Sequence, residues 1–498
     1  MTLDEAKTAL AALQKSLHAY THAAGLLYYD GVTGGPSGGA RERGETFAFL
    51  SGELYKLSTG VQAGELLDFL DENKQELTQA EARQTELMRK QLRELRKIPM
   101  DEYVAYQQLC SESSAVWHSA KSKNDWLMWQ PYLEKIVAAL RRFASLVEPD
   151  KDPYDYCLDQ YEEGLTQQTC DSFFAVLKEK IVPLIGRVKE AGQVPYDFLA
   201  AEVPTAKQEE LSRWLMSLIG MDPAYSTIAT TEHPFTTSFS KHDVRITTHY
   251  YEHDFTASMF SVIHEGGHAL YELHIGDELQ GTVLAEGCSM AIHESQSRFY
   301  ENILGRSRAF ISFIYPKLAQ ISPAIAAHTP EEVYKAINRA EPSLIRTEAD
   351  ELTYCLHIMV RYELEKTLMH GELEVKDLPA RWDTLYKEYL GVDVPDDRHG
   401  VLQDSHWSDG GIGYFPSYAL GSAYGAQLIG RMKRDVDVER CLASGEFAPI
   451  NAWETEHIWK YGRLYKPGEL LQKALGESFD PTYYTNYLEK KFSEIYGL

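Results

Sequence analysis

The most informative stretch of this chain is Phe260-Ser-Val-Ile-His-Glu-Gly-Gly-His-Ala-Leu-Tyr-Glu272. Its histidines, His264 and His268, are four residues apart, so on a helix both imidazoles leave the same face and can bind one metal ion. Glu265 follows the first histidine and can reach a water bound to that metal. A helix with two surface histidines would carry the same letters, so this pentapeptide is a hypothesis that needs support from elsewhere in the chain.

The pentapeptide has the H-E-x-x-H pattern of zinc peptidases, in which zinc lowers the pKa of a water and a carboxylate takes its proton. A catalytic site of this kind needs a third protein ligand, and His293-Glu-Ser-Gln296 supplies Glu294. Glu294 follows His268 by 26 residues, which leaves room for a turn near Gly276 and Gly281 and for a second helix to return. Two histidines and one glutamate leave a fourth position for water or substrate.

Gly266 and Gly267 lie inside the expected helix, where each costs about 1 kcal/mol relative to alanine. A helix that contains both is expected to have something packed close to its backbone, either the second ligand helix or substrate. A weak helix held by its neighbours is the alternative.

With these motifs the chain resembles the carboxypeptidase Taq family of zinc metallocarboxypeptidases. The resemblance rests on six motifs that occur in the family's order. They are His233-Pro-Phe235, Asp243-Val-Arg-Ile-Thr247, His264-Glu-Gly-Gly-His268, His293-Glu-Ser-Gln296, Ile345-Arg-Thr-Glu-Ala-Asp350 and Gly400-Val-Leu-Gln-Asp-Ser-His-Trp407. The amino-terminal stretch Leu26-Leu-Tyr-Tyr-Asp30 matches more loosely, because tyrosine stands where the family usually has tryptophan.

The resemblance implies a mainly α fold, with a small β-sheet beside the metal helix and a long substrate groove. We expect one metallocarboxypeptidase domain over residues 1–498, in which roughly 1–200 form a helical groove wall and 230–420 contain the catalytic motifs. The implied enzyme is a homodimer that removes single carboxy-terminal residues from peptides with broad specificity but refuses proline. One Zn²⁺ per chain is expected from the ligand types, and Co²⁺ is a possible substitute.

Peptide hydrolysis also needs a general base and a group that stabilises the oxyanion. Glu265 is the candidate base, which would then hand the proton to the leaving amine. By analogy with related helical zinc peptidases, His406 and Tyr414 are candidates for oxyanion stabilisation. Tyr418 competes with Tyr414 for this role, and a packed aromatic side chain is the simpler reading of either tyrosine.

A carboxypeptidase must recognise a free carboxylate, which the planar fork of arginine matches at two points. Arg346 is the first candidate and Arg245 the second. Either arginine can instead form a structural ion pair with the acid near it in sequence, Asp350 or Asp243. Four further residues of the motifs are candidates for holding the metal ligands in orientation, and the sequence does not say which of them does so: His233, Asp243, Asp350 and Asp404.

Composition excludes several partners and compartments. The net charge of −25 disfavours nucleic acid and anionic membrane as partners. The six cysteines lack C-x-x-C spacing, which indicates reduced thiols in a cytosolic protein. No secretion signal is evident at the amino terminus, and no apolar run approaches the roughly 18 residues of a membrane span.

Local patterns predict mostly helices. Residues 80–97 are charged and amphipathic, and Thr329 with Glu332 forms a capping box. Thr205 and Gln208 suggest another capping box, for a helix that ends before Gly220. The segment 235–250 is rich in β-branched residues and predicts a hairpin, either as scaffold or as an edge strand that pairs with a peptide.

Two other functions compete with the carboxypeptidase. A zinc endopeptidase on a similar fold would not need Arg346 and Arg245, and an aminopeptidase would need a carboxylate cluster that includes a Gly-x-Met-Glu-Asn segment, which is absent. A non-catalytic helical scaffold would not explain Glu265 beside a complete ligand set.

Overall fold

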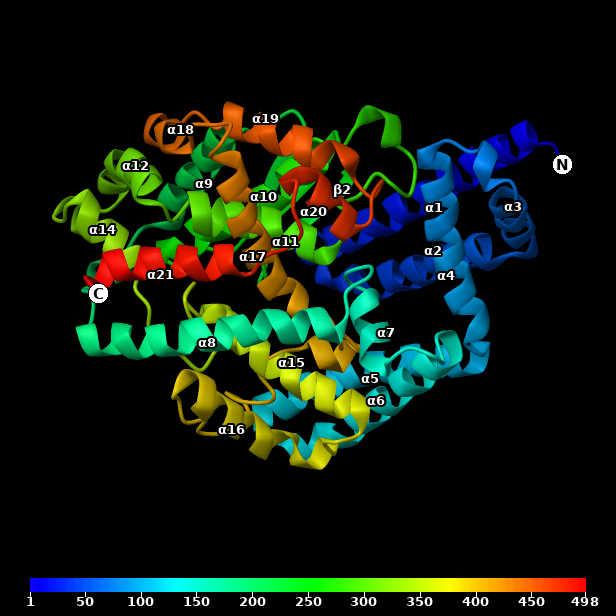
Figure 1. Cartoon of the computed structure of the whole chain (residues 1–498), viewed down its shortest axis with the longest axis horizontal. Helices are drawn as coiled ribbons and strands as arrows, with labels where there is room; N and C mark the ends of the chain where they lie inside the picture. The colour runs from blue at the N-terminus through cyan, green and yellow to red at the C-terminus, as the bar shows by residue number, and fades with distance from the viewer.

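The computed structural model describes all residues, 1–498, as 21 α-helices and three strands. The helices span Leu3–Thr33 (α1), Ala40–Thr59 (α2), Val61–Glu72 (α3), Gln79–Lys97 (α4), Met100–Lys123 (α5), Trp126–Val147 (α6), Pro153–Asp159 (α7), Gln167–Ala191 (α8), Thr205–Ile219 (α9), Phe255–Leu273 (α10), Met290–Arg298 (α11), Arg308–Ile321 (α12), Pro323–Ala326 (α13), Pro330–Ile337 (α14), Tyr354–His370 (α15), Leu378–Leu390 (α16), Phe415–Met432 (α17), Val438–Ser444 (α18), Ala448–His457 (α19), Pro467–Leu475 (α20) and Thr482–Tyr496 (α21). The prediction of a mainly helical chain with a small sheet is confirmed (Figure 1).

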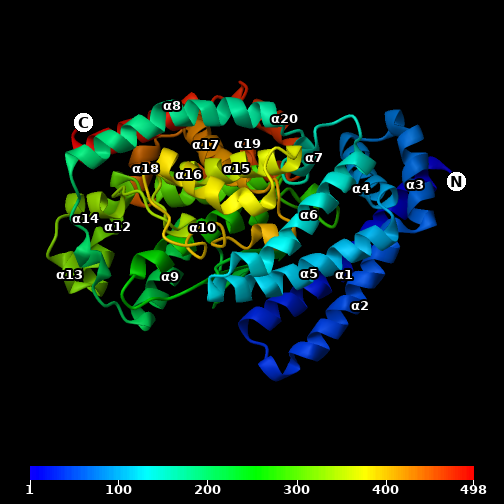
Figure 2. The ribbon, with the colours of Figure 1, turned by 90° about the horizontal axis from the view of Figure 1, so that it is seen from below.

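The two ends of the chain lie far apart. Helices α1 to α4 gather at the amino-terminal end, and α1 and α2 project from the rest as a paired arm (Figures 1 and 2). The carboxy-terminal α21 lies along α8, which is distant in sequence. None of the helices combines the length and the hydropathy that crossing a membrane requires.

One cluster of 108 buried residues, from Ile98 to Ile495, forms the main hydrophobic core. A second cluster of 7 residues joins α1, α3 and α4. The amino-terminal helices therefore have a small core of their own, and the single-domain organisation stays a prediction.

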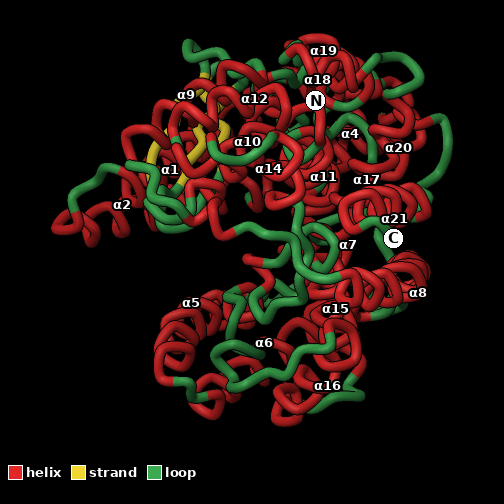
Figure 3. The backbone as a smooth tube through the Cα atoms, turned by 90° about the vertical axis from the view of Figure 1, so that its left-hand side faces the viewer, coloured by secondary structure: helices red, strands yellow, loops and turns green.

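The expected hairpin is present as strands β2 (Thr236–Ser240) and β3 (Asp243–Thr248), which pair in antiparallel fashion. A third strand, β1 (Ser226–Thr230), was not predicted and pairs with β3 in parallel, so the order is β1-β3-β2. The sheet packs against α10 through β2 and β3 (Figure 3 shows the strands in yellow). The hairpin therefore lies beside the helix that carries the two histidines.

Helix α10 is closely flanked, as its two glycines predict. An added Cβ at Gly267 would lie 2.5 Å from the carbonyl oxygen of Gln296 and 2.8 Å from Cα of Ser297, both in the backbone of α11. At Gly266 it would lie 2.4 Å from Cδ1 of Ile219 in α9. The second ligand helix is thus the neighbour that Gly267 accommodates.

Two capping predictions have different outcomes. The box of Thr329 and Glu332 at the start of α14 is confirmed. The box of Thr205 and Gln208 is wrong, because Pro204 is the N-cap of α9 and Thr205 is already helical. The side-chain amide of Gln208 instead donates to the carbonyl of Val203, 2.8 Å away, and to that of the distant Tyr251, 2.9 Å away.

Substitution of Gly267 by alanine tests the contact between α10 and α11. Because the new methyl group meets backbone atoms, the helices must separate, and we expect Gly267→Ala to lower the free energy of unfolding by about 1–3 kcal/mol. The control is Gly186→Ala in α8, where an added Cβ would meet no neighbouring heavy atom within 4 Å. This variant should keep its free energy of unfolding or raise it by up to about 1 kcal/mol. Urea unfolding measures both, and an unchanged midpoint for Gly267→Ala would mean that the contact is not tight.

Candidate metal centre and active site

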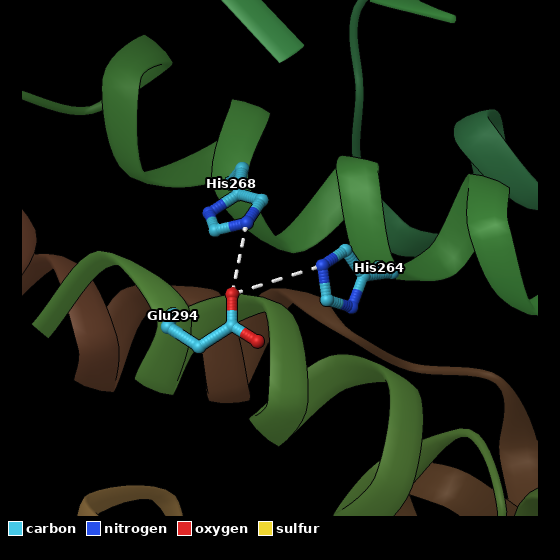
Figure 4. A group of neighbouring side chains, drawn as sticks. All are labelled: His264, His268 and Glu294. Atoms are coloured by element: carbon cyan, nitrogen blue, oxygen red, sulfur yellow. Dashed lines mark ion pairs between the residues drawn. The ribbon is translucent and has the colours of Figure 1, made fainter. Parts of the chain in front are cut away.

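The three ligands proposed from the sequence come together between α10 and α11. Nε2 of His264 lies 3.8 Å and Nε2 of His268 lies 3.5 Å from Oε2 of Glu294. All three donor atoms lie within 4.8 Å of one another (Figure 4). The two imidazoles descend from one helix toward the carboxylate of the other, which is a geometry that fits one small cation.

The local sequence explains why both helices start where they do. Asp254 caps α10 by accepting from the backbone N–H of Ala257, and Ser289 caps α11 by accepting from that of Ile292. The connection turns at Gly281, whose φ of +74° favours glycine. Each ligand therefore lies at a fixed distance from a well-defined helix start.

His264 is oriented by a carboxylate behind it. Its Nδ1 donates to Oε2 of Glu301, 2.8 Å away, in the π-helical turn Phe299–Leu304 that follows α11. Arg298 and Arg306 also donate to Glu301. Although burial favours the protonated acid, the hydrogen bond from His264 lowers the pKa of Glu301 to about 2. The Nε2 atom of His264 is thereby left free on the side that faces Glu294.

Glu294 is buried, with 6% of its surface exposed. Its Oε1 accepts from Nε of Arg298 at 2.7 Å, which leaves Oε2 toward the histidines. Burial alone would raise the pKa of this carboxyl, but Arg298 and His264 hold it well below the usual range. Helix α17 closes the site behind Glu294, since a Cβ at Gly421 would lie 2.7 Å from Cγ of Glu294.

Glu265 points to the sheet. The hydroxyl of Thr236 in β2 lies 2.6 Å from Oε2 of Glu265 and 3.0 Å from its backbone carbonyl oxygen. Burial raises the pKa of Glu265. The edge strand β2 therefore contacts the residue proposed as general base.

The structure brings His406, Tyr414 and Tyr418 into one cluster. Nε2 of His406 lies 3.1 Å from the hydroxyl oxygen of Tyr418, and the rings of Tyr414 and Tyr418 are 5.0 Å apart. Burial and Arg346 lower the pKa of His406 to about 4. Burial and the charge of Glu294 raise the pKa of Tyr414. At neutral pH, these groups are uncharged hydrogen-bond donors.

Arg346 has a carboxylate partner, but not the predicted one. Its Nε and Nη2 lie 2.9 and 2.8 Å from Oδ1 of Asp404, and Nη1 lies 3.2 Å from the hydroxyl of Tyr354. Arg361 pairs with the other oxygen of Asp404. Asp350, the expected partner, instead accepts from the backbone N–H of Leu352 and the hydroxyl of Thr353. Two buried guanidinium groups thus share one carboxylate.

Arg245 forms the ion pair that its alternative reading predicted. Its Nε and Nη2 each lie 2.7 Å from an oxygen of Asp243, and its Cζ lies 5.0 Å from the ring centroid of Tyr29 and 4.8 Å from that of Phe239. His233 is exposed. His233, Asp243, Asp350 and Asp404 accept hydrogen bonds from residues other than the three candidate ligands.

The residues that do contact the ligands were missed from the sequence. They include Arg298 and Ser297 beside Glu294, Glu301 beside His264 and His293 beside His268, with Thr236 beside Glu265. One signal was available, since Arg298 and Glu301 follow Glu294 by four and seven residues, and this spacing places all three on one helical face. Thr236 carries no such signal, because its contact depends on how the sheet packs.

A cavity of about 540 Å³ lies next to the cluster of His406, Tyr414 and Tyr418, between α2, α4, α5, α6 and α7. Tyrosines contribute much of its wall, among them Tyr55, Tyr106 and Tyr161. The ring of Tyr161 is 5.0 Å from that of Tyr414. The cavity therefore adjoins the candidate active site through one aromatic contact.

Comparisons with known proteins identify the family of the chain. The model of the family "Carboxypeptidase Taq (M32) metallopeptidase" matches residues 9–492. The chain is 41% identical to "Carboxypeptidase 1" of Bacillus subtilis over 98% of both chains, and 36% identical to "Thermostable carboxypeptidase 1" of Pyrococcus furiosus over 96% of both. The crystal structure of an M32 carboxypeptidase from Deinococcus radiodurans superposes with a TM-score of 0.96 at 34% identity, covering 99% of this chain and 100% of that one.

Removal of Glu294 tests the ligand set. Glu294→Ala should lose metal but stay folded, because it deletes one of three donors while Arg298 keeps Glu301 as a partner. The control is Glu351→Ala, which removes a buried glutamate paired with Lys491 and should keep the metal. Metal content after dialysis against a weak chelator is measured together with circular dichroism. Full metal occupancy in Glu294→Ala would exclude Glu294 as a ligand.

Proposed function

Because the chain belongs to the carboxypeptidase Taq family of metallopeptidases and is a metallocarboxypeptidase, we propose that it removes single residues from the carboxyl ends of peptides with one zinc ion. The convergence of Nε2 of His264, Nε2 of His268 and Oε2 of Glu294 carries this proposal. This donor set is that of catalytic zinc sites, which keep a fourth position open. Cobalt prefers similar nitrogen and oxygen donors and is a possible substitute.

The general base in this proposal is Glu265. A metal at the site would polarise the scissile carbonyl and lower the pKa of the attacking water. Glu265 accepts the proton of that water and then passes it to the leaving amine. The bond from Thr236 to Oε2 leaves Oε1 of Glu265 available for this work.

We assign stabilisation of the oxyanion to His406 and Tyr414, with Tyr418 as the alternative to Tyr414. A neutral imidazole and a protonated phenol can donate to developing negative charge without being ionised themselves. The low pKa of His406 and the raised pKa of Tyr414 support these protonation states at neutral pH.

Recognition of the substrate carboxylate is assigned to Arg346. Arg346 and Arg361 share the single charge of Asp404, so one positive charge is left over. In a chain with a net charge of −25, this excess is a local attraction for a peptide's anionic end. Arg245 is second, because its pairing with Asp243 leaves no such excess.

Two surfaces would contact the backbone of the peptide substrate in this proposal. Strand β2 is an edge of the sheet and reaches Glu265 through Thr236, so an extended peptide can add to it as a further strand. The cavity beside Tyr161 is the part of the expected groove next to Tyr414. The homodimer, the broad specificity with refusal of proline and the cytosolic location rest on resemblance and composition and stay predictions.

Substitution of Glu265 by glutamine tests the base. Glu265→Gln removes the proton acceptor and leaves the ligands intact, so we expect the metal to remain while the rate falls by at least about 100-fold. Glu278→Gln removes the same charge from an exposed position and should keep both metal and activity. A metal-loaded Glu265→Gln protein that cleaves at the wild-type rate would exclude Glu265 as the base.

Paired peptides, one with a free carboxyl end and one amidated, test Arg346. A charge-assisted two-point contact contributes about 1.5–3 kcal/mol, so Arg346→Ala should reduce the ratio of kcat/KM for the free peptide over the amidated one by roughly ten- to a hundred-fold. Arg346→Lys should restore part of this preference, because it keeps the charge but not the fork.

Arg245→Ala is the matched control and should leave the ratio unchanged. If only Arg245→Ala changes the ratio, the role belongs to Arg245. If the wild-type enzyme shows no preference, the endopeptidase reading is favoured instead.

A further inference from the structure

His268, the second candidate ligand, has a different support from His264. Its Nδ1 lies 2.6 Å from Nδ1 of His293, and Nε2 of His293 lies 2.8 Å from Oε1 of Glu272. Glu272 lies one helical turn after His268 in α10, and His293 directly precedes Glu294 in α11. These side chains form a row of hydrogen bonds that links the two ligand helices.

The position of each proton in this row follows from the carboxylate. An ionised carboxylate only accepts, so Nε2 of His293 donates to Glu272. Neutral His293 then has its lone pair at Nδ1, which accepts from Nδ1 of His268. The remaining lone pair of His268 is at Nε2, the atom that faces Glu294 at 3.5 Å. The row thus selects the tautomer of His268 that can bind a metal.

The imidazole of His293 is held in place by its surroundings. A Cβ at Gly287 would lie 2.4 Å from Cδ2 of His293, so the ring packs directly on the backbone there. The ring of Tyr271 lies 5.2 Å from the imidazole. The backbone N–H of Gly287 also donates to Oε1 of Glu272 at 3.0 Å, which fixes the acceptor.

We propose that Glu272 and His293 are positioning residues that hold His268 in the tautomer and orientation required for metal binding. This inference rests on the proposed metal ligands and goes beyond them, because neither residue is itself a proposed ligand. Hydrogen-bonded partners of metal-binding histidines typically contribute about 10- to 100-fold in metal affinity. The readout is therefore metal affinity, which does not depend on turnover.

The experiment measures the dissociation constant for Zn²⁺ by competition with a chelator. His293→Phe keeps a ring but has no acceptor, and we expect its Kd to rise by about 10- to 100-fold. His293→Asn places an amide oxygen near the former Nδ1 and should recover most of the affinity. The visible spectrum of the cobalt-loaded protein, which reports ligand geometry, should change in His293→Phe and return in His293→Asn.

A double-mutant cycle tests whether Glu272 affects His268 only through His293 or independently of it. Glu272→Gln should raise the Kd in the wild-type background and have no effect in the His293→Phe background, because Glu272 acts only through His293. The matched control is His370→Phe, which removes a histidine that is 22% exposed and paired with Asp152, against 23% for His293. Its Kd should equal that of the wild type.

A folded His293→Phe protein with the wild-type Kd, or additive effects of the two substitutions, would overturn the proposal. If His293→Phe does not fold, Glu272→Gln decides, and an unchanged Kd in that variant contradicts the row. His268→Ala separates this outcome from failure of the ligand set. If His268→Ala binds zinc as tightly as the wild type, the ligand assignment fails and the proposed row fails with it. If His268→Ala loses zinc while His293→Phe and Glu272→Gln keep the wild-type Kd, only the row is overturned.

Discussion

The close approach of α10 and α11 at Gly267 is the constraint on which the rest of the site depends. Only a residue without a Cβ lets the backbone of α11 come so near, and this distance brings Oε2 of Glu294 within reach of both imidazoles. Helix α17 approaches Glu294 closely in the same way, at Gly421. The ligand geometry is therefore set by backbone packing, and a close-packed interior resists compression.

Burying so many charges requires that they be balanced locally. Around the candidate metal site, Glu294 and Glu301 are matched by Arg298 and Arg306, and the buried Glu265 adds a carboxyl group without an arginine partner. Around Asp404 the balance is different, because two arginines share one carboxylate. The excess at the second group is the basis of the role proposed for Arg346.

Much of this arrangement could be predicted from the sequence, because it depends on spacing within single helices. The metal helix, the return of the second helix, the hairpin and the crowding at Gly267 all follow from local patterns. What could not be predicted depends on contacts between distant segments. Arg346 pairs with Asp404, 58 residues away, rather than with Asp350, and Gln208 reaches Tyr251 instead of capping its own helix. The parallel strand β1 likewise exists only because β3 offers it an edge.

The proposed ligands of one metal ion are Nε2 of His264, Nε2 of His268 and Oε2 of Glu294. Anomalous X-ray scattering at the zinc edge, from crystals of the zinc-loaded protein, tests this assignment most directly. We expect a single strong peak between α10 and α11, about 2.0–2.2 Å from each of the three atoms. A peak elsewhere, or ligation through Nδ1 of either histidine, would contradict it.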